Sequence, residues 1–220
     1  MRALLTSAAL AAGLTLAGQA HAALICGSTI TVANGGSLLA SNLGAGVCVA
    51  AADKTFGNFV NLGGAGVQNV AFNWSAPVGG THTLAFSDSF TGPATGTTAI
   101  NIGFEVVDNA STITSLTGDF NQSTPTTSSL VKATSPVGTG SINFSKTGNV
   151  PTGPDEIDYS PGVTDIIVLE TLTLGANAFV GSIENTFTET AAAVPEPMTI
   201  AVLGGTLFGL GAIRMRRRAE

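Results

Sequence analysis

Ile100-Asn101-Ile102-Gly103-Phe104-Glu105-Val106 decides the fold class, because its large apolar residues occupy every second position. Successive side chains of a strand point to opposite faces, so this period of two puts the four large residues on one face. The same alternation gives Val70, Phe72 and Trp74 a common face. Both stretches therefore predict β-strands with one buried face.

The pattern recurs along the chain, and residues 166–174 are apolar on both faces, as in a central strand. Residues 53–59, with two phenylalanines among polar residues, are predicted to be a loop packed on the core. No convincing amphipathic helix interrupts this body, and strands recur about every 10 to 20 residues. This spacing predicts an all-β antiparallel β-sandwich, jelly-roll or immunoglobulin-like, of eight or more strands. Turns and loops are predicted between the strands, where residues typical of turns occur, at 76–80, 91–93, 108–109, Pro125, 135–138 and 151–162.

Residues 1–22 have the features of a secretory signal peptide. A single early positive charge, an apolar run over 3–17 and the pattern Ala20-His21-Ala22 are what signal peptidase recognises. Cleavage is expected before Ala23. The run is too short for a membrane span, which takes about 20 apolar residues.

A second uncharged stretch, 198–213, lies near the C-terminus. As a helix it covers about 24 Å of a hydrocarbon core roughly 30 Å thick, so it predicts a short transmembrane helix. The basic tail 214–220 follows, and its arginines are expected to hold that end in the cytoplasm. These topology residues are Arg214, Arg216, Arg217 and Arg218.

The motif Val194-Pro195-Glu196-Pro197 directly precedes this helix. Motif, apolar helix and arginine cluster together resemble the PEP-CTERM sorting signal of Gram-negative bacteria, here over 191–220. The resemblance implies that an exosortase recognises Pro195, Glu196 and Pro197 and processes the chain for export. The tail also occurs on exported proteins described as ice-binding. A plain C-terminal tail anchor is the alternative.

The predicted β-domain, 23–190, is acidic. It contains twelve of the fourteen carboxylates of the chain, whose formal net charge is -6, and only three basic residues, Lys54, Lys132 and Lys146. An acidic surface repels phosphate backbones and anionic lipid heads, so the composition argues against a nucleic-acid-binding protein.

Cys26 and Cys48 are the two cysteines, and both lie in the exported part. An even pair in an oxidising compartment predicts a disulfide. Closing a loop of about 23 residues contributes on the order of 3 kcal/mol. A free catalytic thiol is the rival interpretation.

His82 is the single histidine beyond the signal peptide and aligns with Leu84 and Phe86, which points it toward the apolar face or its edge. One histidine makes no metal cluster, and no Gly-x-Ser-x-Gly motif accompanies it. The sequence therefore predicts no catalytic residues, no cofactor and no enzyme. A hydrolase that uses His82 is kept as the second alternative to the non-enzymatic function stated at the end of this section.

Asp155, Glu156 and Asp158 form a weak calcium candidate in the predicted loop 151–162. Their spacing does not match an EF-hand, and a solvated acidic loop is the favoured interpretation. No metal site is therefore predicted.

Together these features predict an exported, non-enzymatic surface or extracellular-matrix protein with a structural or adhesive role in biofilm exopolysaccharide. Its expected partners are signal peptidase, an exosortase, the inner membrane as a transient anchor, and exopolysaccharide. The first alternative is a carbohydrate-binding module, which would need exposed aromatic residues, and Trp74 and Tyr159 are the candidates.

Overall fold

The computed structural model describes residues 24–191, which fold into β-strands with one 3-10 turn, η1 (Ala40–Asn42), and one short helix, α1 (Leu62–Ala65). The predicted signal peptide, sorting motif, membrane helix and arginine tail lie outside the described residues. No helix within 24–191 is long and apolar enough to cross a membrane. The strands are β1 (Ser28–Val32), β2 (Gly36–Leu39), β3 (Val47–Ala51), β4 (Lys54–Val60), β5 (Asn69–Trp74), β6 (Thr81–Thr91), β7 (Thr98–Asp108), β8 (Ser111–Gln122), β9 (Thr127–Ser135), β10 (Thr139–Thr147), β11 (Val150–Thr152), β12 (Asp155–Val163), β13 (Asp165–Leu174) and β14 (Phe179–Ala191).

All these strands belong to one hydrogen-bonded sheet, and its pairs are antiparallel except for β1 with β3. This confirms the all-β, antiparallel-rich class. Many neighbours in the sheet are distant in sequence; β13, for example, lies between β7 and β9. The order is β1-β3-β4-β7-β13-β9-β10-β12-β8-β14-β6-β5-β2, with β11 paired to β10.

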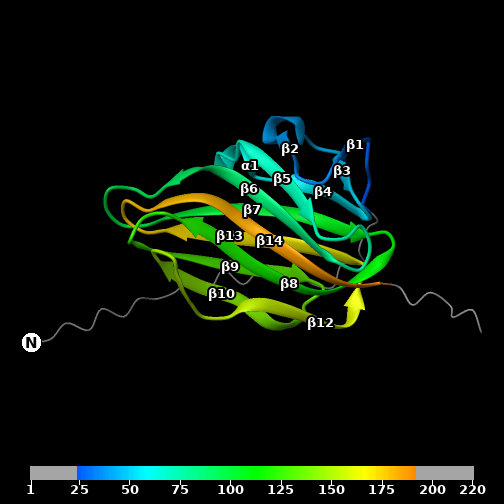
Figure 1. The fold of residues 1–220 in the computed structure, drawn as a ribbon. Helices are drawn as coiled ribbons and strands as arrows, with labels where there is room; N and C mark the ends of the chain where they lie inside the picture. The colour runs from blue at the N-terminus through cyan, green and yellow to red at the C-terminus, as the bar shows by residue number, and fades with distance from the viewer. Residues whose placement is uncertain (1–23, 192–220) are drawn as a thin grey trace, which may run out of the picture.

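The sheet folds over so that its two halves face each other as layers (Figure 1). Phenylalanines define the contact between them. Phe187 of β14 lies 6.3 Å from Phe104 of β7 and 6.1 Å from Phe56 of β4, measured between ring centroids. The rings of Phe120 on β8 and Phe144 on β10 are 5.4 Å apart. The layers are thus β1-β3-β4-β7-β13-β9-β10 and β12-β8-β14-β6-β5-β2, hydrogen-bonded to each other between β10 and β12.

The alternation seen in the sequence sets which side chains fill the space between the layers. In β7, Ile102, Phe104 and Val106 are buried, as their spacing predicts. In β13, buried residues alternate with half-buried ones, so this strand is covered on one face and partly on the other. Burying a large apolar side chain stabilises the fold by about 1.5–3 kcal/mol, which makes this phenylalanine-rich interior the main stabilising element.

Two predicted loops are strands in the structure. Residues 53–59 fall largely within β4, and 151–162 contain most of β11 and most of β12. In β12 the inward residues are Ile157 and Tyr159, both buried, and they alternate with the exposed Glu156 and Asp158. The proline and glycine content of 151–162 concealed this period of two.

Candidate functional site

The predicted disulfide is present. Cys26 precedes β1, Cys48 lies buried on β3, and their Cα atoms are 5.5 Å apart. The parallel pairing of β1 with β3 brings the two residues together, with Thr29 opposite Cys48. The bond ties the first described residues to the sheet, and no free cysteine remains in the described part of the chain.

A cluster of buried ionisable side chains closes one end of the apolar interior. It comprises Asp53, Lys54, His82, Asp108 and Glu189, and is called the Lys54 cluster below. Lys54 begins β4, Asp108 ends β7, His82 lies at the start of β6, and Glu189 lies near the end of β14. The antiparallel arrangement places these strand ends together.

The ammonium group of Lys54 is fully buried and contacts three carboxylates. Its Nζ lies 2.5 Å from Glu189 Oε1, 2.9 Å from Asp108 Oδ2 and 3.0 Å from Asp53 Oδ1. Asp53 precedes Lys54 directly, whereas Asp108 and Glu189 come from distant strands. One cation therefore holds β4 to β7 in its own layer and to β14 in the opposite layer.

Hydrogen bonds fix the two buried carboxylates. The backbone N–H of Ser111 donates to Asp108 Oδ1 at 2.7 Å, and that of Gly79 donates to Glu189 Oε2 at 3.2 Å. The Ser111 hydroxyl lies 2.6 Å from Asp108 Oδ2 and 2.8 Å from Glu189 Oε2. These donors offset part of the cost of removing two carboxylates from water.

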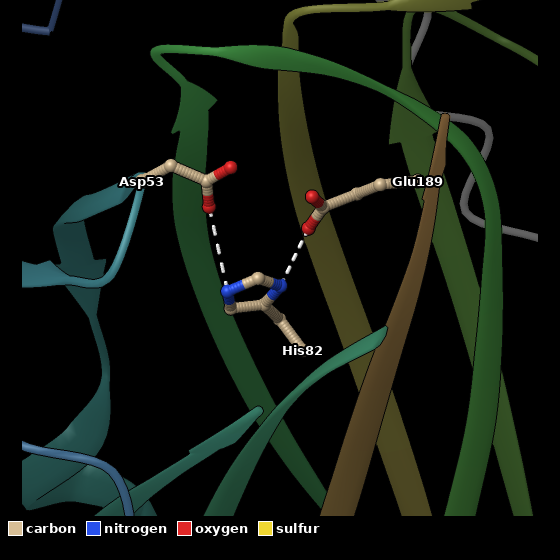
Figure 2. A group of neighbouring side chains, drawn as sticks. All are labelled: Asp53, His82 and Glu189. Atoms are coloured by element: carbon tan, nitrogen blue, oxygen red, sulfur yellow. Dashed lines mark ion pairs between the residues drawn. The ribbon is translucent and has the colours of Figure 1, made fainter. Parts of the chain in front are cut away.

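His82 lies between two carboxylates (Figure 2). Its Nδ1 is 2.5 Å from Glu189 Oε1, and its Nε2 is 3.4 Å from Asp53 Oδ1. Neither contact has the direction of a good hydrogen bond. The ring of Trp74 stacks on the imidazole, with centroids 6.0 Å apart and planes inclined by 23°. His82 is 2% exposed, so the prediction that it points toward the apolar face or its edge is confirmed.

Burial and charge act against each other on the pKa values here. Burial lowers the pKa of Lys54, but hydrogen bonds to Glu189, Asp108 and Asp53 outweigh it and raise the pKa above the usual 10.5. Burial raises the pKa of Asp108, but hydrogen bonds from Ser111 and Lys54 leave it below 3.8. The pKa of His82 is lowered, mainly by burial and further by the charge of Lys54. The cluster thus holds an ammonium, ionised Asp108 and a neutral imidazole at neutral pH.

Asp53, His82 and Glu189 are the one group among residues 24–191 with the ligand types and spacing of a cation site, since their ligand atoms lie within 4.8 Å of one another. Nitrogen and carboxylate oxygen are ligands that zinc accepts. However, the Lys54 ammonium already contacts both carboxylates. The ammonium thus supplies the positive charge between these carboxylates, and a metal ion would have to compete with it for the same oxygens.

The three acidic residues predicted as a weak calcium candidate do not converge. Asp155, Glu156 and Asp158 are exposed along β12, and no calcium loop surrounds them. Side chains alternate between strand faces, so Asp155 leaves the sheet on the face opposite to Glu156 and Asp158. This geometry favours the solvated acidic segment over the calcium site.

The aromatic residues considered for carbohydrate binding are not openly exposed. Tyr159 is 5% exposed and packs with the core, while Trp74 is half-buried against His82. The Lys54 cluster itself was missed by the sequence prediction. Its signal was the same period of two, because Lys54 aligns with Phe56, and Glu189 with Phe187. A charged residue in an inward position predicts a buried partner of opposite charge.

The fold and this cluster define a disulfide-bonded, all-β protein with buried charges at one end of its core. No family model, curated protein or solved structure matches the chain.

Proposed function

We propose that this chain is an exported, non-enzymatic protein of the bacterial cell surface or exopolysaccharide matrix, which an exosortase processes through residues 191–220. The disulfide supports export, because such bonds persist in oxidising compartments. The motif at 194–197 and the following arginines support the sorting route.

One observation carries the matrix assignment: every cationic side chain of the described domain is buried. Lys54, Lys132 and Lys146 are 0%, 5% and 9% exposed, and residues 24–191 contain no arginine. The domain therefore presents carboxylates, hydroxyls and amides to solvent, without an exposed lysine or arginine. Such a surface does not adsorb to nucleic acid or anionic lipid, and it suits a hydrated polysaccharide matrix.

The geometry of His82 supports a non-enzymatic role over the hydrolase alternative. A serine nucleophile needs an imidazole nitrogen as its base while a carboxylate holds the other nitrogen. Here Asp53 and Glu189 face the two ring nitrogens. Burial of the ring beneath Trp74 further separates it from substrate.

The proposal includes two finer structural assignments. The folded sheet is taken as a jelly-roll or immunoglobulin-like sandwich. In this chain the two layers stay hydrogen-bonded to each other between β10 and β12. Residues 198–213 are taken as the single transmembrane helix that holds the chain transiently in the inner membrane before release.

The sorting route is tested by fractionating host cells that produce the wild-type chain or a variant with alanine at Pro195, Glu196 and Pro197. The wild type is expected outside the cell without Arg214–Arg218, and the variant is expected to remain membrane-bound with these arginines. Glu220→Ala, outside the motif, is the control and is expected to behave as wild type. Release of the triple variant, or secreted wild type that retains its arginines, would contradict the proposal.

A further inference from the structure

A second buried polar group crosses the middle of the molecule, away from the Lys54 cluster. It consists of Lys132 on β9, Glu170 on β13 and Asn185 on β14, with 5%, 2% and 0% of each residue exposed. Such a set is costly to bury among apolar residues, so its chemistry needs an explanation.

The three side chains are hydrogen-bonded to one another. Lys132 Nζ lies 2.5 Å from Asn185 Oδ1 and 2.7 Å from Glu170 Oε2. Asn185 Nδ2 donates to the same Glu170 Oε2 at 3.2 Å. One carboxylate oxygen therefore contacts both the amine of Lys132 and the amide nitrogen of Asn185.

The fold holds these atoms in place from both layers. Lys132 and Glu170 are opposite each other in the β9–β13 pair, and Asn185 comes from the facing layer, opposite Gly118 of β8. A Cβ at Gly118 would lie 2.7 Å from Lys132 Cε. A glycine at this position leaves room for the lysine side chain to cross the core.

We propose that Lys132 and Asn185 become joined by an intramolecular isopeptide bond, with Glu170 transferring the proton. The arrangement has what amide exchange requires: a buried amine, an adjacent carboxamide and a carboxylate that reaches both nitrogens. The step is independent of the proposed function in the matrix.

The reaction balances without an oxidant or co-reactant. Glu170 takes a proton from the Lys132 ammonium, and the neutral amine attacks Cγ of Asn185, forming the Nζ–Cγ bond. Glu170 then gives the first proton to Nδ2 and takes a second proton from Nζ, so that it ends the reaction protonated. The Cγ–Nδ2 bond breaks, the carbonyl reforms, and one molecule of ammonia leaves.

The environment makes the Lys132 ammonium easier to deprotonate, as the attack needs. Burial lowers the pKa of Lys132, and the negative charge of Glu170 offsets this only in part. Transferring the proton between Lys132 and Glu170 also replaces two buried charges with two neutral groups, which a low dielectric favours.

The other two lysines of the described domain lack this arrangement. Lys54 contacts carboxylates, and its raised pKa keeps it protonated. Lys146 donates to the backbone carbonyl of Phe120 and pairs with Asp119. Lys132 is thus the one described lysine hydrogen-bonded to a carboxamide side chain, and Lys146 provides a matched control.

The cross-link would join β9 of one layer to β14 of the other. Unlike the hydrogen bonds of the sheet, a covalent bond between layers survives denaturant. It also complements the disulfide, which ties only the first strands together.

The test is mass spectrometry of the full-length chain, folded, then unfolded and reduced. We expect the mass difference between wild type and Lys132→Met to exceed that of the substitution by one ammonia, about 17 Da. Glu170→Gln is expected to lack the loss, whereas Lys146→Met is expected to keep it. Trypsin is expected to leave Lys132 of the wild type uncut and to yield one peptide that links the segments around Lys132 and Asn185.

A wild type of full mass, or a linked peptide that excludes these two residues, would overturn the proposal. An ammonia loss that persists in Lys132→Met would do the same, because it would point to cyclisation of an asparagine elsewhere. If the variants fail to fold, the wild-type linked peptide alone decides the question.

Discussion

Replacing Lys54 by methionine is expected to destabilise the protein by about 3–5 kcal/mol, the usual cost of removing one partner from a buried ion pair. The substitution leaves Asp108 and Glu189 buried without the cation that lies 2.9 Å and 2.5 Å from them. Methionine has nearly the length of lysine, so little of the loss comes from a cavity. For a domain of this size, the melting temperature falls on the order of 10 °C.

Urea unfolding followed by Trp74 fluorescence measures this loss, because Trp74 stacks on a ring that contacts Glu189. The control is Lys146→Met, whose partner Asp119 has a half-exposed side chain that water can solvate once the cation is removed, so a smaller loss than in Lys54→Met is expected. Equal losses in the two variants, or a Lys54→Met protein as stable as wild type, would refute the importance of the buried cation.

The remaining predictions concern pH, the disulfide and packing. The pKa of Lys54 is raised in the folded protein, so its stabilising charge is fully present below pH 10.5 and is lost as the pH rises through the higher folded pKa. The urea midpoint of the wild type is therefore expected to fall above pH 10.5. The midpoint of Lys54→Met is expected to fall less over the same pH range. Cys26→Ser combined with Cys48→Ser is expected to lower the unfolding free energy by about 3 kcal/mol, and an equal loss on reducing the wild type checks this. Gly118→Ala is expected to lower the unfolding free energy by about 1–3 kcal/mol, because the new Cβ meets the side chain of Lys132, which its hydrogen bonds hold in place. Gly44→Ala is the control, since Gly44 lies in open space, and it is expected to leave the thermal midpoint unchanged.

The strand class was predictable because burial of one face imposes a local pattern. Val70, Phe72 and Phe104 lie inward in the structure as their period of two predicts. The disulfide was also predictable, since two cysteines allow only one pairing within the chain. Residues 151–162 were predicted wrongly, because proline and glycine were given more weight than the alternation of Ile157 with Tyr159.

The buried charges were only half predictable. Alternation assigns Lys132 to the same face as Leu130, and Glu170 to the same face as Leu172, so each charge is marked as inward by its neighbours in the strand. The identity of the partner is not marked. Lys54 and Asp108 are 54 residues apart, and Lys132 and Asn185 are 53 apart.

By itself the sequence determined the all-β class, the positions of the strands with a clear period of two, the apolar side chains of those strands that turn inward, and the pairing of Cys26 with Cys48. These follow from local geometry and from counting. The tertiary structure alone decided the order of strands in the sheet and its folding into two facing layers. Partners of buried charges follow from that order, because contact between distant strands depends on packing of the whole chain and not on any local period.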